Sequence, residues 1–334
     1  MANSIYTDED YKFVKSILAD KPTGVSLEEI IYRCHFTSEQ LTYIFNAFRK
    51  ERYRVFIIEK YGEKRLILKD DYMRECGYND RIVTDKDSIK IVLISDTHFG
   101  SKNDNPRIMY KVYDFCKEKG VEHIIHLGDV IEGKEYYVKQ SCKSSLRYSL
   151  TDECQLENLN NNMPYDKGIT THVLAGNHDS HTNDGIALDI VGELIKTYDR
   201  SDIAVAGFDY AKFPVNNDVL YLNHGFIKDF RSFENDLDNN LILCGHSHWS
   251  KNDIFHGYVV EYVTTLSNIE HINPKYNKSG GQFYVGFVTL DIKFNEDKMF
   301  DNIVISRYAL SNNYFGKPEL QSPISEVEFC RVRK

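Results

Sequence analysis

Five short apolar runs in this chain each lead directly into a polar cluster that contains Asp, Asn or His, and no other sequence feature constrains the fold as strongly. Apolar runs of about four to eight residues are typical of buried strands, and helical stretches separate several of these runs. The clusters, in chain order, are Asp96-Thr97-His98, Gly128-Asp129, Gly176-Asn177-His178-Asp179, His224-Gly225 and Gly245-His246-Ser247-His248. The alternation predicts an α/β domain, and in such sheets ligands collect at the carboxyl ends of the strands.

The side-chain types in these clusters are suited to divalent metal ions. Imidazole, carboxylate and amide oxygen bind Mn, Fe, Zn and similar ions, and a carboxylate has two oxygens with which it can bridge two of them. Two ions about 3.5–4 Å apart can hold both the attacking and the leaving oxygen of a phosphoryl transfer. In Asp-x-His and His-x-His, an extended backbone would point both side chains to the same side. Glycines before Asp129, Asn177 and His246 predict tight turns and close approach of the chain.

The composition is that of an acidic globular protein. Of the 334 residues, 42% are hydrophobic, and the formal net charge of -9 gives no global attraction to nucleic acid or anionic membranes. The seven cysteines include no Cys-x-x-Cys pair, so we expect reduced thiols rather than a disulfide framework. The polar N-terminus is unlike a signal peptide, and no apolar run reaches membrane-spanning length. These features predict a cytoplasmic protein without a membrane partner.

Residues 1–70 have a different pattern, in which three helical stretches precede two β-rich runs. The expected helix N-caps are Thr7, Ser26, and Ser38 or Thr37. The two β-rich runs flank a turn at residues 61–64, which predicts a hairpin. Three short helices and a hairpin resemble a winged helix-turn-helix domain.

The third helix and the hairpin of this region carry more positive than negative charge. The basic residues are Arg49, Lys50, Arg52, Arg54, Lys60, Lys64 and Arg65, against Glu51, Glu59 and Glu63. This surplus could contact the phosphates of DNA or RNA, with the third helix in a groove. It could also be a solvated face of a domain that serves protein contact or dimerisation. Residues 71–88 are polar and aperiodic and form the expected linker.

Residues 89–334 are expected to form the second domain. Helices are predicted near residues 106–119 and 185–196, and beyond residue 257 the chain is mainly strand. The polar stretch at residues 134–166 is longer than a simple connection needs, so it is either a lid or substrate loop or a helical insertion.

Together and in this order, the five clusters resemble the motif set of the calcineurin-like metallophosphoesterases, over about residues 89–268 with a tail of strands to about residue 310. The resemblance implies a four-layer α/β/β/α sandwich, here preceded by the winged helix-turn-helix domain. The implied ligands are Asp96, His98 and His248 for one ion, Asn177, His224 and His246 for the other, and Asp129 as the bridge. Manganese is the expected metal, with iron, zinc or nickel as alternatives.

The resemblance also implies a reaction, the hydrolysis of a phosphate ester by a hydroxide that the two ions activate, with no phosphoenzyme intermediate. His178 would lie beside the phosphate as general acid or transition-state stabiliser, and Asp179 would orient it. Two other histidines near the motifs, His126 and His181, are expected to be structural or supporting residues.

One departure from the family pattern bears on the substrate. Family members that act on phosphoproteins usually carry an Arg in Gly-Asp-x-x-Asp-Arg-Gly, whereas this chain reads GDVIEGK and has no Arg there. A protein Ser/Thr phosphatase is therefore disfavoured. Lys134 could contact phosphate instead, or it could be a solvated loop lysine.

Three functions are compatible with these patterns. The one we expect is a phosphodiesterase acting on nucleic acid, with the N-terminal domain positioning DNA or RNA. The alternative is a phosphatase or phosphodiesterase of a small molecule such as a nucleotide, with the winged helix serving protein contact or dimerisation. A third is a winged-helix regulator with an inactive phosphoesterase scaffold, which the complete ligand set argues against.

Overall fold

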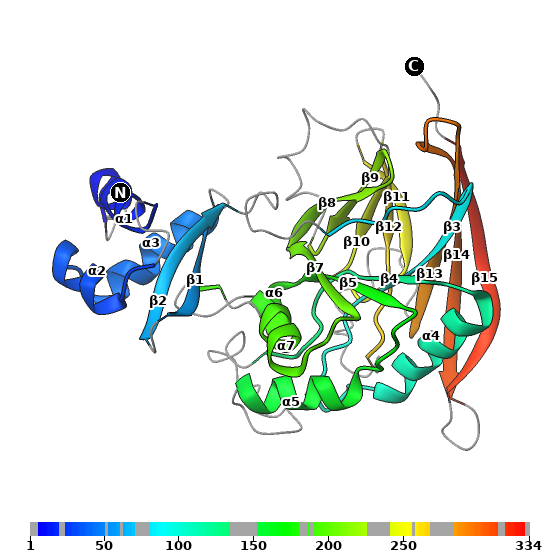
Figure 1. Cartoon of the computed structure of the whole chain (residues 1–334), viewed down its shortest axis with the longest axis horizontal. Helices are drawn as coiled ribbons and strands as arrows, with labels where there is room; N and C mark the ends of the chain where they lie inside the picture. Colours follow the sequence, from blue (N-terminus) through cyan, green and yellow to red (C-terminus); the bar gives the residue numbers. More distant parts are fainter. Residues whose placement is uncertain are drawn as a thin grey trace. The chain divides into compact units, whose positions relative to one another are not determined.

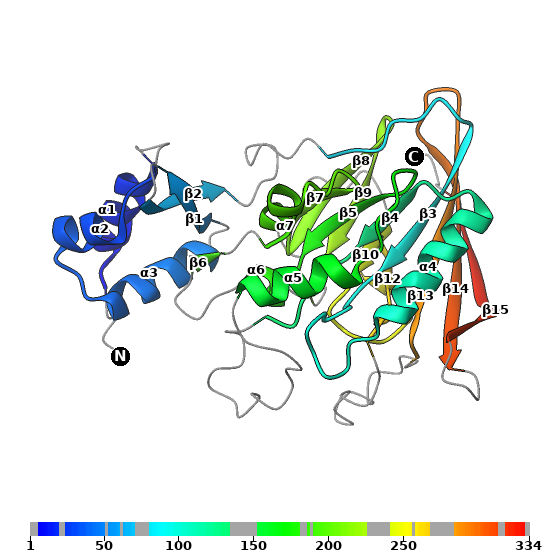
Figure 2. The same cartoon turned by 60° about the horizontal axis from the view of Figure 1, so that its bottom comes forward.

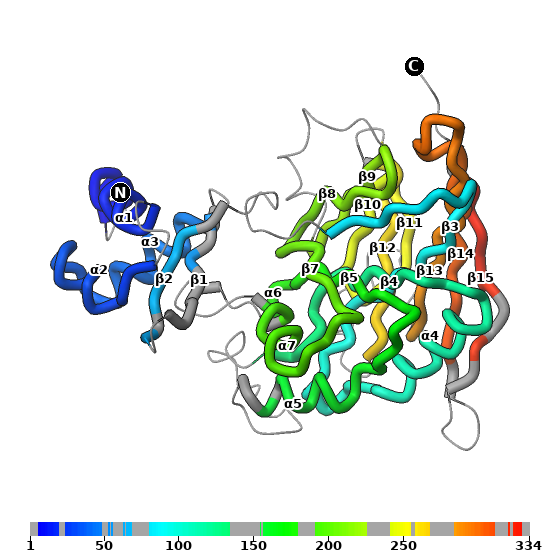
Figure 3. The backbone as a smooth tube through the Cα atoms, in the orientation of Figure 1, coloured from blue at the N-terminus to red at the C-terminus, as the bar shows by residue number. Residues whose placement is uncertain are grey.

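A computed structural model describes the protein over residues 6–19, 24–50, 53–60, 63–70, 80–133, 152–180, 186–187, 190–225, 241–255, 258–267, 284–312 and 318–330. The chain divides into two compact units. Figures 1 and 3 show its course, coloured by residue number. The first comprises Met1–Tyr78, Glu135–Gln140 and Ser180–Asp189, and the second comprises Asn79–Lys134, Ser141–Asp179 and Ile190–Lys334. Among the described residues, no helix has the length and apolar character needed to cross a membrane.

The described residues of the first unit form three helices and a small sheet. Helices α1, α2 and α3 and strands β1 and β2 span Asp8–Ala19, Leu27–Cys34, Ser38–Lys50, Tyr53–Lys60 and Glu63–Asp70. The two strands pair antiparallel with Lys60 opposite Glu63, so the connection has two residues. Glu63 and Lys64, expected in the turn, therefore belong to β2. Apolar side chains such as Ile44 and Phe48 are fully buried in the core of this unit.

The predicted N-caps explain where the helices begin. The hydroxyls of Thr7 and Ser26 each accept a hydrogen bond from the N–H three residues on, at 3.2 and 3.1 Å. For α3 the cap is Thr37 rather than Ser38. The Thr37 hydroxyl accepts from the N–H of Gln40 at 3.2 Å, and the Gln40 side-chain oxygen accepts from the N–H of Thr37 at 3.0 Å. This reciprocal pair is a capping box.

A third strand of this sheet comes from a distant part of the sequence. Strand β6, Ile186–Ala187, pairs parallel to β1 and lies opposite Val55 and Phe56. The helix predicted over residues 185–196 therefore begins later, because helix α7 spans Ile190–Tyr198. The prediction was wrong at its start because a short apolar run fits a helix face as well as a strand.

The second unit is a mixed α/β domain built on one hydrogen-bonded sheet (Figures 1 and 2). Strands β3 to β5 and β7 to β15 span Ser88–Ile94, His123–His126, Thr170–Ala175, Ile203–Phe208, Tyr210–Val215, Asp218–Asn223, Leu241–Cys244, Lys251–Phe255, Tyr258–Tyr262, Gly286–Phe294, Phe300–Asn312 and Pro318–Cys330. Their order across the sheet is β11-β12-β10-β9-β8-β7-β5-β4-β3-β13-β14-β15.

Two runs of parallel strands position the polar clusters. Strands β3, β4, β5 and β7 are parallel neighbours, and so are β9, β10 and β12. The two runs are connected through β8, which pairs with β7 only at Phe208 and Tyr210. Ile91, Ile125 and Ile242 in these strands are completely buried, which explains why the strands read as continuous apolar runs. Each of the five polar clusters follows one of these parallel strands.

The helices of the second unit follow the first strands of the sheet. Helix α4, Pro106–Lys119, has the predicted bounds, and helix α5, Asp152–Asn162, lies in the polar stretch at residues 134–166. The described part of that stretch is therefore a helical insertion, and Lys134 lies outside the described residues. Figure 2 shows α4, α5 and α7 along one face of the β3 to β7 part of the sheet. Residues 226–240 and 268–283 are also outside the described residues.

Replacing Arg200 should destabilise this domain strongly. Its guanidinium makes two 2.8 Å hydrogen bonds to the carboxylate of Asp202 and another to the carbonyl of Pro164, and both charged side chains are buried. Arg200→Met leaves Asp202 charged and unpaired, so the free energy of unfolding should fall by about 3–5 kcal/mol in urea titrations. The exposed control Arg107→Met should change it by less than about 0.5 kcal/mol. If both variants changed the free energy of unfolding by a similarly small amount, the buried Arg200–Asp202 pair would not have the stabilising role assigned to it.

Candidate metal centre

The structure places the predicted site residues at the carboxyl ends of five strands. They are Asp96 and His98 after β3, Asp129 after β4, Asn177, His178 and Asp179 in helix α6 (Asn177–Ser180) after β5, His224 after β9, and His246 and His248 after β10. Two of these, His246 and His248, are half-buried, and the others are buried. The potential ligand atoms form three overlapping groups, which are Asp96 with His98 and His248, Asp129 with His224 and His246, and His98 with Glu132 and His178.

Five of the site residues have left-handed backbone conformations. Their φ angles are 53° at Asp96, 45° at His98, 54° at Asp129, 71° at His246 and 60° at His248. The backbone of Asp-x-His and His-x-His is therefore not extended, because the chain turns sharply at each motif. Such conformations cost about 1–3 kcal/mol each in residues with a Cβ, and they cluster at functional sites where the surrounding structure holds them.

Three glycines allow the motif loops to approach one another closely. A Cβ on Gly128 would lie 2.3 Å from Nδ1 of His224. One on Gly176 would lie 2.4 Å from Oδ1 of Asp129, and one on Gly245 would lie 2.4 Å from a backbone carbonyl oxygen after β4. These distances are far inside van der Waals contact, so the prediction of close approach at the three glycines is confirmed.

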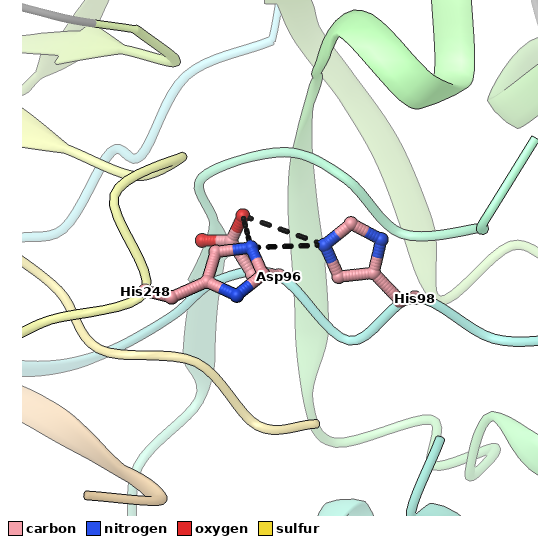
Figure 4. A group of neighbouring side chains, drawn as sticks. All are labelled: Asp96, His98 and His248. Carbon is pink, nitrogen blue, oxygen red and sulfur yellow. Dashed lines mark hydrogen bonds and ion pairs between the residues drawn. The ribbon is translucent and has the colours of Figure 1, made fainter. Parts of the chain in front are cut away.

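The first group joins Asp96, His98 and His248 (Figure 4). Nε2 of His248 lies 3.2 Å from Oδ1 of Asp96 and 3.1 Å from Nε2 of His98. The other Asp96 oxygen is occupied by the Ser95 hydroxyl at 2.6 Å and the N–H of His246 at 3.0 Å. Oδ1 is buried and has no partner with hydrogen-bond geometry among the described residues. Two imidazole nitrogens and this oxygen therefore converge on one point, as ligands of a divalent ion do.

Protons compete for the same nitrogen atoms. Burial opposes a charge on His98, but the carboxylates of Asp96 and Glu132 raise the pKa of His98 well above its usual range. Burial alone would raise the pKa of Asp96, but His248 and His98 lower it well below its usual range. In the metal-free protein, a protonated imidazole balances the carboxylate charge, and a bound cation would take over that role.

The second group joins Asp129, His224 and His246. Nδ1 of His224 lies 2.6 Å from the carbonyl oxygen of Leu127, so it carries a proton, and Nε2 faces Oδ1 of Asp129 at 3.1 Å. The other oxygen of Asp129 lies 3.8 Å from Nε2 of His98 in the first group. One carboxylate therefore faces both groups, which is the geometry required of a bridging ligand.

Asn177 directly precedes His178, whose backbone N–H binds the carboxylate of Asp129. The N–H of His178 donates to Oδ1 of Asp129 at 2.9 Å, and this bond holds the start of α6 against the site. The amide nitrogen of Asn177 is buried and has no hydrogen-bond partner among the described residues. An ion would be bound by the amide oxygen of Asn177, not by this nitrogen, so the ligand role of Asn177 stays a prediction.

The imidazole of His178 is oriented by a backbone carbonyl. Its Nδ1 lies 2.6 Å from the carbonyl oxygen of Glu132, so Nδ1 carries a proton and Nε2 faces the site, 3.8 Å from Oδ2 of Asp129. The ring packs edge-on against His98, with centroids 4.7 Å apart. Burial lowers the pKa of His178, with a smaller opposing effect from the Asp129 charge.

The carboxylate of Asp179 binds backbone N–H groups of two loops. It accepts hydrogen bonds from the N–H groups of Val130, Ile131 and Gly176 at 3.1, 2.9 and 2.8 Å. It therefore binds the backbone of the loops after β4 and β5, and the Glu132 carbonyl fills the role of orienting His178. Burial, together with the charge of Asp129, raises the pKa of Asp179 to about 7.

Glu132 is the residue at this edge that the sequence interpretation left without a role. Its carboxylate lies 3.0 Å from Nδ1 of His98. The available signal was an acidic residue three positions after Asp129, where the chain departs from the phosphoprotein phosphatase pattern. His126 supports the loops, because Nδ1 accepts from the N–H of Gly128 at 3.2 Å, and burial lowers its pKa to about 3. His181 lies outside the described residues.

A protein-family model described as calcineurin-like phosphoesterase matches residues 89–276. That range is more than half of the chain and contains all nine predicted site residues. The chain therefore belongs to the calcineurin-like phosphoesterases. It is a hydrolase that acts on phosphoric ester bonds, and its His, Asp and Glu clusters are groups that could hold divalent metal ions.

Several solved structures are similar to this chain at low sequence identity. A Streptococcus pneumoniae protein, predicted to be a phosphoesterase, has 14% identity over 73% of this chain and 98% of its own, with a TM-score of 0.39. Zinc-bound Vps29 of Entamoeba histolytica has 12% identity over 72% and 99%, with a TM-score of 0.37. An archaeal phosphodiesterase has 14% identity over 65% and 99%, also with a TM-score of 0.37. No curated protein matched, so the family assignment rests on the family model.

Metal binding should release protons and become tighter as pH rises. Burial opposes a charge on His224, but the Asp129 carboxylate raises the pKa of His224 to about 10. A metal binds only the neutral imidazole, so at lower pH each binding event must displace a proton. Calorimetric titration of the apo-protein with Mn²⁺ in two buffers of different ionisation enthalpy should show this release. The affinity should increase between about pH 6 and about pH 8, and a pH-independent affinity would contradict the prediction.

Proposed function

We propose that the protein is a two-metal phosphodiesterase that acts on nucleic acid and uses manganese. The observation that carries the proposal is the single carboxylate of Asp129, which faces both ligand groups while His178 packs beside it. The proposed ligands are Asp96, His98 and His248 for one ion, and Asn177, His224 and His246 for the other. When bound, the ions supply Lewis-acid activation of water and neutralise charge on the phosphate oxygens.

In this proposal, His178 moves the proton to the leaving oxygen. Its Nδ1 proton is held by the Glu132 carbonyl, so Nε2 is the atom that can carry a second proton towards the reacting group. Burial lowers the pKa of His178, so the charged form that donates this proton is depleted as pH rises. The acid-catalysed part of the rate should therefore decrease on the alkaline side.

The charges around the site favour a diester over a monoester. A phosphate monoester carries nearly two negative charges at neutral pH, whereas a diester carries one. In the GDVIEGK motif, the chain lacks the Arg that could stabilise a dianion. The carboxylate of Glu132 in this motif is buried beside His98. An extra negative charge in a buried environment repels the dianion more than the monoanion.

The first unit supports nucleic acid as the source of the diester. It has three helices and a hairpin, the pattern that resembles a winged helix-turn-helix domain, and basic residues are concentrated in α3 and the hairpin. Arg65 is not among the candidates for phosphate contact, because its guanidinium donates to the carbonyl of Gly24 at 2.9 and 3.1 Å. Lys60 and Lys64 remain the hairpin lysines that we propose to contact phosphates.

The His178→Ala variant should lose turnover but keep its metal. The residue is proposed to donate a proton rather than to bind an ion, so the loss should be about 10²–10⁴-fold for substrates with a poor alkoxide leaving group, such as a dinucleotide. The loss should be smaller for an aryl phosphodiester, whose leaving group needs less protonation. Rates on both substrates and metal analysis of the purified variant check this.

The matched comparison for that experiment is Asp129→Asn. This change removes the charge that faces both ligand groups, so it should abolish turnover on both substrates and lower the metal content. If His178→Ala also loses its metal, or loses the same factor on both substrates, the proton-donor role is wrong.

Removing the hairpin lysines should weaken nucleic-acid binding. With Lys60→Gln and Lys64→Gln combined, the slope of log affinity against log salt for a labelled DNA should fall by about 1 for each lost contact. Lys111→Gln, in α4 of the second unit, is the control and should leave the slope unchanged. Turnover of a small aryl diester should be unaffected by all of these changes. An absence of DNA binding and cleavage at low salt with Mn²⁺ would instead favour a small-molecule substrate.

A further inference from the structure

We infer that Glu132 is a positioning residue for His98, which it orients so that Nε2 points at Asp96 and His248. The inference rests on the proposed function only in that this group is taken to hold a metal ion. It assigns a role to Glu132, an acidic residue of this edge that is not among the proposed ligands.

The contact between the two side chains is short and buried. Oε2 of Glu132 lies 3.0 Å from Nδ1 of His98, and the residues are 7% and 5% exposed. Among the described residues, Nδ1 of His98 has no hydrogen-bond partner of regular geometry, and its 3.0 Å contact with Glu132 is an ion-pair contact. The carboxylate is therefore the group that can hold this nitrogen, and water is largely excluded from the contact.

The backbone fixes the position from which Glu132 reaches His98. Its N–H donates to the carbonyl of Phe99 at 2.9 Å, and its own carbonyl oxygen lies 2.6 Å from Nδ1 of His178. The next residue, Gly133, has a φ of 69°, and a Cβ there would lie 2.4 Å from the carbonyl oxygen of His178. With the backbone held on both sides, the carboxylate is presented to His98 from a rigid position.

A carboxylate in this position has two consequences for a metal ligand. It stabilises the tautomer with the proton on Nδ1, which leaves the Nε2 lone pair free for an ion, and it fixes the plane of the ring. It also makes the imidazole a better donor. Loss of such a partner typically weakens metal affinity by about 10–100-fold.

The two ligand groups should respond differently to a change at Glu132. His98 belongs to the group with Asp96 and His248, whereas His224, in the other group, is oriented by the carbonyl of Leu127. A positioning role therefore predicts that the affinity for one of the two bound ions decreases and that the affinity for the other does not. A general structural role predicts that both are weakened alike.

The test is a Mn²⁺ titration of the full-length apo-protein, followed by electron paramagnetic resonance and calorimetry. In Glu132→Ala, one site should lose about 10–100-fold in affinity while the other is unchanged. Glu132→Gln keeps an oxygen that can accept from Nδ1, so it should recover most of the affinity. Glu122→Ala and Glu122→Gln are matched controls on an exposed glutamate that pairs with Lys86 at 2.7 Å, and they should bind as the unchanged protein does.

Two results would overturn the inference. Glu132→Ala could bind both ions with unchanged affinity, or it could weaken both ions equally with no recovery in Glu132→Gln. Because the titration uses no substrate, its outcome is independent of which phosphate ester the enzyme hydrolyses. A protein that hydrolyses no nucleic acid could still show the selective loss, so failure of the proposed function and failure of this inference can be told apart.

Discussion

The buried carboxylate of Asp179 is the interaction on which the geometry of the site depends. It receives hydrogen bonds from three backbone N–H groups in the loops after β4 and β5. Those loops carry Asp129 and His178, so one side chain sets the position of the proposed bridging ligand relative to the proposed proton donor. Asp96 works in a similar way, because its Oδ2 accepts the N–H of His246 and thereby holds the loop after β10. Acidic side chains thus join loops that the sheet alone would leave as separate turns.

The same edge concentrates charge in a place that excludes water. Asp96, Asp129 and Glu132 are nearly inaccessible, and an uncompensated buried carboxylate is costly. Imidazoles compensate for these charges when they are protonated, and divalent cations do so when they are bound. The left-handed backbone at five site residues adds to the cost of building the site. A site built in this way is stabilised by the cation that it binds, since metal binding and folding are linked.

Much of the fold was predictable because its signals are local. The apolar runs became buried strands, Thr7 and Ser26 became helix caps, and α4 has the predicted bounds. Strand β6 was not predictable, because Ile186–Ala187 pairs with a strand that lies 131 residues earlier in the chain, and nothing in two apolar residues encodes that partner. The cap of α3 was ambiguous because Thr37 and Ser38 are both good capping residues, and the position of Gln40 decided between them.

The sequence by itself determined which side chains reach one edge of the sheet, because parallel buried strands deliver the residues that follow them to the same end. Tertiary structure alone decided how those residues are used. The left-handed backbone conformations at Asp96 and His246 could not be predicted, because the spacing of residues in a motif does not determine their φ angles. The partners of Asp179, His178 and His98 were hidden because they lie on other loops, where only the close packing around Gly128 and Gly176 brings them within hydrogen-bonding distance.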